Sequence, residues 1–171
     1  MSMRKLIIVA CLILGGANSA LHAQISSKSV EADVIVSESI GLPEINALLQ
    51  EAYTHMGTRY RGGGKTPQGF DCSGFVGYCY SNVLGIKTPA SSSGFHGAGL
   101  QVSKLDAKPG DVICFTGSNA SRRISGHVGI ITEVTDSNIY FIHSATSSGI
   151  RIDSVNQPYY KNRFLEIRRF F

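Results

Sequence analysis

The hydrophobic period of the sequence changes at Pro109-Gly110-Asp111, and this change limits the folds open to the chain. Before this turn, apolar residues recur at helical spacing over residues 42–56 and 72–84. After it come short apolar runs of strand length: Val112 to Phe115, His127 to Val134, Ile139 to His143, Gly149 to Ile152 and Phe164 to Phe171. Helices followed by strands predict an α+β fold, with N-terminal helices packed on a C-terminal antiparallel sheet of about five to six strands. Residues 87–101 are expected to form a long polar loop.

Local signals mark the ends of the two predicted helices. Pro43 suits a first helical turn and Gly57 suits a stop, which gives a helix over 42–56. Asp71 precedes the second helix, where its carboxylate would cap free N–H groups, and Gly85 ends that helix. His55, near the end of the first helix, is expected to be solvated.

The N-terminus has the pattern of a secretory signal peptide. Arg4 and Lys5 give a positively charged start. The apolar run from Leu6 to Leu14 is too short to span a bilayer, and small residues then lead to Ala23. We therefore expect a signal peptide over residues 1–23 and an exported protein, located in the periplasm or the cell envelope, with no transmembrane segment in its mature chain.

Two alternatives to this cleavage site remain open. Cleavage could follow Ser19, or the signal could be that of a lipoprotein, in which Cys11 would carry a lipid anchor. After the signal, residues 24–41 are Ser-rich and form a polar lead-in, and residues 42–171 are expected to form one domain.

Charge gives little indication of a nucleic-acid partner. Loss of Arg4 and Lys5 with the signal leaves fourteen basic and twelve acidic residues. A balance this close to neutral does not favour binding to a polyanion, so no nucleic acid is expected as a partner. We expect a monomer.

The mature chain keeps three cysteines: Cys72, Cys79 and Cys114. An odd number in an exported protein leaves at least one thiol free. If Cys72 and Cys79 share a helix, they lie roughly 10 Å apart, too far for a disulfide. Cys79 and Cys114 are expected to be buried packing residues. No paired Cys or His spacing indicates zinc, and no metal or cofactor is expected.

Cys72 opens the second predicted helix, and this position suits a nucleophile. A thiolate at a helix N-terminus is stabilised by the helix dipole and by free N–H groups, which can also hold an oxyanion. Ser73 and Gly74 are small and would let a substrate approach the backbone. Taken alone, however, a cysteine in an apolar stripe is more often a packing residue.

Two histidines could assist such a thiol. His127 begins one predicted strand, between glycines, and His143 ends the next. Opposed residues of an antiparallel pair point the same way, so the two rings share a face only if the hairpin has an odd loop or a bulge. A turn centred on Asp136 would put His143 opposite Gly129 and diagonal to His127. His127 would then act as the base, and His143 would accept a hydrogen bond from its far nitrogen.

The order of these motifs resembles the NlpC family of bacterial cell-wall cysteine peptidases, in its short, single-domain exported form. Asp71-Cys72-Ser73-Gly74-Phe75 follows Tyr60 and a glycine pair, and Pro109-Gly110-Asp111, Gly126-His127-Val128-Gly129-Ile130 and Phe141-Ile142-His143 come next. The resemblance covers residues 42–171. It implies a papain-like fold, a catalytic triad of Cys72, His127 and His143, and a Tyr60 that lines the site near the oxyanion. It also implies that Asp71 and Ser73 help to hold the substrate, the peptide stems of peptidoglycan.

Some residues depart from the family pattern. Arg59 and Gly62 stand where many relatives carry a proline and an aromatic residue, and Ala90 and Gly94 fall near the usual arginine and glutamine. The function that the sequence predicts is a cysteine endopeptidase that cleaves an amide bond in stem peptides or cross-links through a Cys72 thioester. The alternatives are an amidase or acyltransferase of the same superfamily and a catalytically silent wall-binding module.

Overall fold

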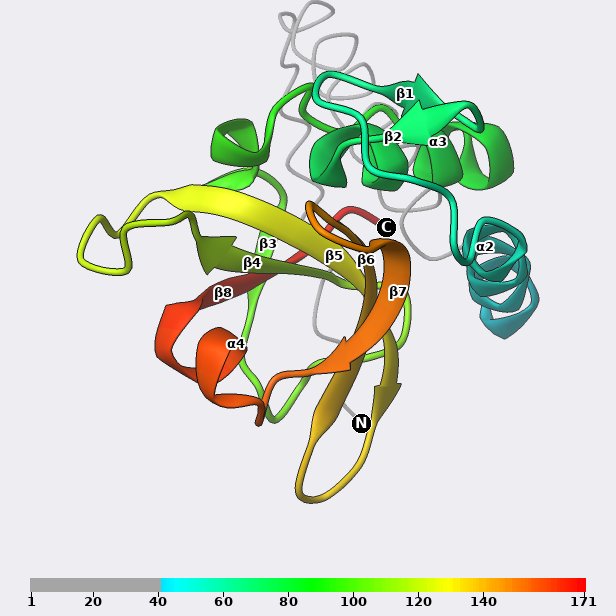
Figure 1. The fold of residues 1–171 in the computed structure, drawn as a ribbon. Helices are drawn as coiled ribbons and strands as arrows, with labels where there is room; N and C mark the ends of the chain where they lie inside the picture. Colours follow the sequence, from blue (N-terminus) through cyan, green and yellow to red (C-terminus); the bar gives the residue numbers. More distant parts are fainter. Residues whose placement is uncertain (1–40) are drawn as a thin grey trace, which may run out of the picture. The chain divides into compact units, whose positions relative to one another are not determined.

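The computed structural model describes residues 41–171. The predicted signal peptide, the possible anchor at Cys11 and all but the last residue of the predicted lead-in lie outside the described residues. Three α-helices lie within this range: α2 (Leu42–Thr54), α3 (Cys72–Leu84) and α4 (Pro158–Arg163). A 3-10 helix, η1, spans Ser92–Phe95. The strands are β1 (Lys65–Thr66), β2 (Gly69–Phe70), β3 (Leu100–Val102), β4 (Val112–Thr116), β5 (Ser125–Val134), β6 (Ile139–Ala145), β7 (Gly149–Ser154) and β8 (Phe164–Arg169) (Figure 1).

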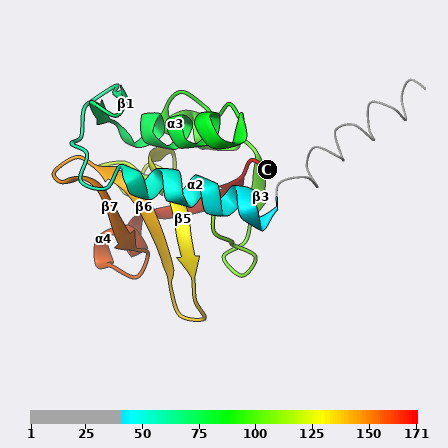
Figure 2. The same ribbon diagram turned by 90° about the vertical axis from the view of Figure 1, so that its right-hand side faces the viewer.

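The predicted α+β class is confirmed. Six antiparallel strands form one sheet in the order β3-β8-β4-β5-β6-β7, and β1 and β2 form a separate two-stranded hairpin. The helices α2 and α3 run side by side across the same side of the sheet (Figure 2). Among the helices of residues 41–171, none is long and apolar enough to cross a membrane.

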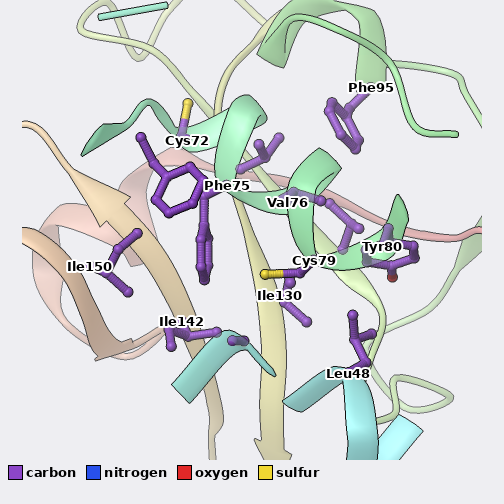
Figure 3. Close-up of a cluster of buried hydrophobic side chains, with 14 of the residues drawn as sticks. Leu48, Cys72, Phe75, Val76, Cys79, Tyr80, Phe95, Ile130, Ile142 and Ile150 are labelled. Atoms are coloured by element: carbon purple, nitrogen blue, oxygen red, sulfur yellow. The ribbon is translucent and has the colours of Figure 1, made fainter. Parts of the chain in front are cut away.

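The sheet separates two apolar clusters, because alternate residues of a strand point to opposite faces. On β4, Val112 and Cys114 belong to the cluster beneath α2 and α3, whereas Ile113 and Phe115 belong to the cluster on the other face. The first cluster is completed by Leu48, Phe75, Val76, Cys79, Ile130 and Ile142 among others, several of which appear in Figure 3. The second lies beneath the short helix α4, which contributes Tyr160. The sheet therefore has no face open to water along its centre.

The first helix forms for the reasons that its sequence indicates, but it ends early. Pro43 lies in the first turn, and the Glu44 carboxylate accepts a hydrogen bond from the backbone N–H of Gly41 at 3.0 Å. The helix stops at Thr54 rather than at residue 56. His55 follows it and, contrary to expectation, is buried: its ring packs at 5.2 Å from that of Phe70 and contacts Glu51 at 3.1 Å.

The segment 87–101 is more ordered than the predicted polar loop. Phe95 of η1 is fully buried against the ring of Phe170, at a centroid distance of 5.6 Å. Residues 100 and 101 begin β3, which pairs with β8 and becomes an edge strand of the sheet. A single apolar residue in a serine-rich stretch carries no periodicity, so the sequence pattern could not reveal this docking.

Candidate active site

Cys72 is the first residue of α3, as the sequence predicts. The Asp71 carboxylate accepts a hydrogen bond from the backbone N–H of Gly74 at 2.6 Å and so caps the helix. The Cys72 side chain is 8% exposed. In Figure 3 its sulfur points away from the apolar cluster, whereas the sulfur of Cys79 points into it. Cys72, Cys79 and Cys114 are all unpaired thiols.

A glycine-rich loop is fixed against the N-terminus of this helix. Gly63 donates its backbone N–H to the Asp71 carboxylate at 3.0 Å, and the Gly64 carbonyl accepts the N–H of Asp71 at 2.9 Å. The approach is so close that a Cβ added to Gly74 would lie 2.1 Å from the Gly64 carbonyl oxygen. Position 74 therefore requires glycine, because the backbone of Gly64 occupies the space that a Cβ would need.

The surroundings of Cys72 act on its thiol in two directions. Burial raises the pKa of Cys72 above its usual value, and this is the largest effect. Backbone hydrogen bonds from Val128, which follows His127, and from Ser73 partly oppose it by lowering the pKa. Tyr60 is adjacent: burial raises the pKa of its phenol, and the charges of Cys72 and Asp71 raise it further.

The two predicted histidines lie on one face of the sheet. The β5–β6 register pairs Ile130 with Ile142, and one step further places His143 beside Gly129, whose added Cβ would lie 3.0 Å from the His143 Cβ. This is the register that the sequence predicted, and it is reached through an irregularity between Ile131 and Glu133 rather than by the loop alone. Because Gly129 has no side chain, it leaves room for the His143 imidazole to extend across it.

His127 and His143 are hydrogen-bonded to each other. The distance from His127 Nε2 to His143 Nδ1 is 2.9 Å, and the ring planes are perpendicular at 89°. Burial, with a smaller contribution from the neighbouring His143, lowers the pKa of His127 to about 3. Burial also lowers the pKa of His143. Both rings are therefore neutral at physiological pH.

The Cys72 sulfur lies near the backbone N–H of Val128, the residue after His127. None of the side-chain hydrogen bonds found among residues 41–171 joins Cys72 to His127. Catalytic hydrogen bonds are often long before substrate binds and shorten in the complex. The remaining His127 nitrogen, Nδ1, takes no part in the bond to His143. It is the atom that could receive a proton from a thiol.

One charged residue beside the histidine pair, Asp153, was not predicted from the sequence. It lies on β7, two register positions from the strand partner of His143, and it is 4% exposed. The Asp153 carboxylate accepts a hydrogen bond from His143 Nε2 at 2.9 Å and one from the Tyr160 hydroxyl at 3.0 Å. The available signal was an acidic residue inside an alternating strand directly after the His143 strand.

A cleft of about 450 Å³ opens beside the histidine pair. It is lined by both histidines and by residues from β7 and α4, among them Arg151, Asp153, Tyr159 and Tyr160. A second cavity of about 320 Å³ lies along α3. Ser73, Gly77, Thr88 and Ala90 are among its lining residues. The residue after Cys72 thus lines one cavity, and the histidine pair lines the other.

Asp71 and Ser73 both have partners within the chain. Besides capping α3, Asp71 accepts the Ser73 hydroxyl at 3.0 Å. The Ser73 side chain also lines the second cavity, next to the carbonyl of Ala90. Asp71 therefore holds the loop and helix together, while Ser73 is the one of the two that faces a hollow. Among residues 41–171, no group of three or more His, Cys, Asp or Glu side chains is arranged to hold a metal ion.

Known proteins share both the sequence and the fold. The sequence model of the NlpC/P60 family matches residues 57–169. The murein DD-endopeptidase MepS/murein LD-carboxypeptidase of Escherichia coli K12 is 37% identical over 113 residues, which are 66% of this chain and 56% of that protein. The chain thus spans about half the length of this curated relative.

Two further matches extend the comparison. A protein of the same strain, named probable endopeptidase NlpC, is 31% identical over 165 residues, which are 96% of this chain and 97% of that protein. The crystal structure of an NlpC/P60 family protein from Bacillus cereus matches with a TM-score of 0.64 and 28% identity, covering 74% of this chain and 40% of that one. The shared papain-like α+β fold and the match across 57–169 agree, and the chain belongs to the NlpC/P60 family.

Proposed function

We propose that this protein is a cysteine endopeptidase that cleaves an amide bond in the peptide stems or cross-links of peptidoglycan. The observation that supports the proposal is that Cys72 opens a capped helix close to the backbone of Val128, which follows His127 of the hydrogen-bonded His127–His143 pair. A relative matched over 113 residues is named as a murein DD-endopeptidase/LD-carboxypeptidase, and a second, matched over nearly the whole chain, is named as a probable endopeptidase. A peptide bond in murein is therefore the substrate class that the family membership supports.

In the proposed reaction, His127 is a general base. Burial raises the pKa of Cys72 and lowers that of His127, so the free enzyme holds a neutral thiol and a neutral imidazole. His127 takes the thiol proton as the sulfur attacks the carbonyl carbon, and the imidazolium then protonates the leaving amine. Water hydrolyses the resulting thioester. The proton is therefore transferred during the attack, in contrast to a thiolate that exists beforehand.

Backbone N–H groups and Tyr60 are proposed to stabilise the oxyanion. The N–H groups of the first turn of α3 point toward the end of the helix where Cys72 lies, and a helix N-terminus favours negative charge. Tyr60 lies close enough to Cys72 for a charge on the sulfur to raise its pKa. Ser73 is proposed to contact the substrate from the second cavity, whereas Asp71 keeps the loop in place for it.

The proposed domain organisation is a signal peptide over 1–23, a polar lead-in over 24–41 and the peptidase domain over 42–171. Export would bring the enzyme to its substrate in the cell envelope. Cytosolic retention of a fusion of the N-terminal segment to a reporter enzyme that works only after export would contradict this part of the proposal.

The test of activity is digestion of purified peptidoglycan, with the fragments identified by mass spectrometry. The purified chain should release peptide fragments whose masses locate the cleaved bond, and Cys72→Ala should release none. Equal fragment patterns from both proteins would refute the proposal. An added amine acceptor that appears in the products would instead indicate acyl transfer, and binding without cleavage would indicate a wall-binding module.

A further inference from the structure

The buried Asp153 carboxylate accepts hydrogen bonds from four side chains, two at each oxygen. Oδ2 accepts from His143 Nε2 at 2.9 Å and from the Tyr160 hydroxyl at 3.0 Å. Oδ1 accepts from Arg151 at 2.6 Å and from the Gln157 amide at 3.1 Å. These donors hold the pKa of this carboxyl well below its usual range, although burial alone would raise it. Asp153 is therefore an anion throughout the physiological pH range.

An ionised carboxylate fixes the proton positions along the chain of rings. It has only acceptor sites, so the hydrogen between it and His143 must lie on His143 Nε2. A neutral imidazole carries one N–H, which leaves Nδ1 of His143 as an acceptor. His127 must then donate to it from Nε2, at 2.9 Å. The consequence is that His127 Nδ1 is left with a free lone pair, as a general base requires.

We propose that Asp153 is a positioning residue that sets this proton order and, through His143, stabilises the positive charge that forms on His127. The inference rests on the proposed function, in which His127 is the base. A neutral histidine alone would polarise His127 only weakly. A carboxylate behind it supplies the negative charge that an orienting aspartate supplies directly in other hydrolases. Thus the catalytic arrangement extends over four side chains: Cys72, His127, His143 and Asp153.

The variant Asp153→Asn tests this proton order because its orientation can be foreseen. Arg151 and Gln157 both donate toward the Oδ1 position, so the amide oxygen of asparagine should lie there. Its NH2 group then points at His143 Nε2, which must become an acceptor. His143 would carry its hydrogen on Nδ1 and donate it to His127, whose own hydrogen would move to Nδ1 and block the base.

The expected activity loss follows from the loss of a correctly protonated base. General-base catalysis contributes on the order of 100-fold to 10⁴-fold, so kcat on a peptidoglycan fragment should fall by about 100-fold or more. KM should change by less than about threefold, because the carboxylate acts through two rings rather than on the substrate. A rise in KM of about 100-fold, with kcat unchanged, would overturn the proposal.

Asp111→Asn is a matched control. Asp111 is another buried aspartate, but it pairs with Arg169 at 2.7 Å and forms no hydrogen bond with His127 or His143. The same chemical change there should lower the melting temperature and leave kcat of the folded enzyme within about twofold of wild type. A kcat loss in Asp111→Asn as large as that in Asp153→Asn would show that a general structural defect explains both, and would overturn the proposal.

A spectroscopic measurement separates this inference from the proposed function and does not depend on the variant's folding. In ¹⁵N-histidine NMR spectra of the wild-type protein at pH 7, both His127 and His143 should carry hydrogen on Nε2. Hydrogen on Nδ1 of either ring would overturn the proposal, whatever the substrate. If the wild type shows the expected tautomers but cleaves no peptidoglycan, the proposed substrate fails while the proton order stands.

Discussion

Gly74 and Gly77 lie one turn apart on α3, yet alanine at these two positions should change stability in opposite directions. A Cβ at Gly74 would lie 2.1 Å from the Gly64 carbonyl oxygen and 3.1 Å from the Asp71 carboxylate. A Cβ at Gly77 would meet only the Thr88 hydroxyl, at 3.3 Å. Because both substitutions are Gly→Ala in the same helix, the difference between them isolates the contact with the glycine-rich loop.

The magnitude follows from what must move. Real Cβ contacts are essentially never shorter than 3.0 Å, so the Gly64 carbonyl must retreat by about 0.9 Å. That oxygen also accepts the Asp71 N–H at 2.9 Å, a bond that the retreat would weaken. Overpacking costs about 1–3 kcal/mol and the weakened hydrogen bond about 1 kcal/mol, against a gain of about 1 kcal/mol in helix propensity. Gly74→Ala should therefore lower the free energy of unfolding by about 2 kcal/mol.

Gly77→Ala should gain the same helix propensity without a clash against the Gly64 carbonyl. A rotation of the Thr88 side chain relieves the single contact, so this variant should gain about 0.5 kcal/mol or more. In a domain of this size, about 2 kcal/mol corresponds to a fall in melting temperature of roughly 6–10 °C. Differential scanning calorimetry and urea unfolding of both variants provide the measurement. A Gly74→Ala protein as stable as Gly77→Ala would refute the reasoning.

Three further outcomes are expected. The free energy of unfolding should fall as the pH drops from about 6.5, the pKa of an unfolded histidine, toward about 3, the pKa of His127 in the folded protein, because only the unfolded chain binds a proton in that range. The lowered pKa of His143 acts in the same direction. A urea midpoint that is constant between pH 7 and 5 would contradict this. Cys72 is 8% exposed whereas Cys79 and Cys114 are fully buried, so iodoacetamide should label Cys72 in the native protein faster than either of them, although the raised pKa of Cys72 slows the reaction; mass spectrometry counts the labels. Ser144→Ala removes a buried hydroxyl that donates to the Phe70 carbonyl at 2.8 Å, so calorimetry should show a loss of about 1–2 kcal/mol, and an unchanged melting temperature would argue against that bond.

The strand hairpin illustrates how a register can be foreseen without its cause. A turn centred on Asp136 would put His143 opposite Gly129, and the structure has His143 beside Gly129. Two side chains on one face of the hairpin require either an odd number of loop residues or a bulge. The structure contains an irregularity between Ile131 and Glu133. Which of the two occurs depends on packing beneath the strands, and local sequence does not express that packing.

The helices, the strand order in sequence and the capped cysteine were determined by the sequence itself. Hydrophobic period, Pro43, Asp71 and Gly85 act within a few residues of where they stand, so their effects can be read from neighbours alone. Spacing also excluded a disulfide between Cys72 and Cys79, since two residues seven positions apart on one helix lie roughly 10 Å from each other.

Only the tertiary structure decided how the site is completed. Asp153 reaches His143 because β7 pairs with β6 in one particular register, and Tyr160 reaches both because α4 folds back over the sheet. His55 was predicted to be solvated but is enclosed by rings from β2 and α3. These contacts join residues far apart in the chain, and their formation depends on how the layers pack, which no local pattern encodes.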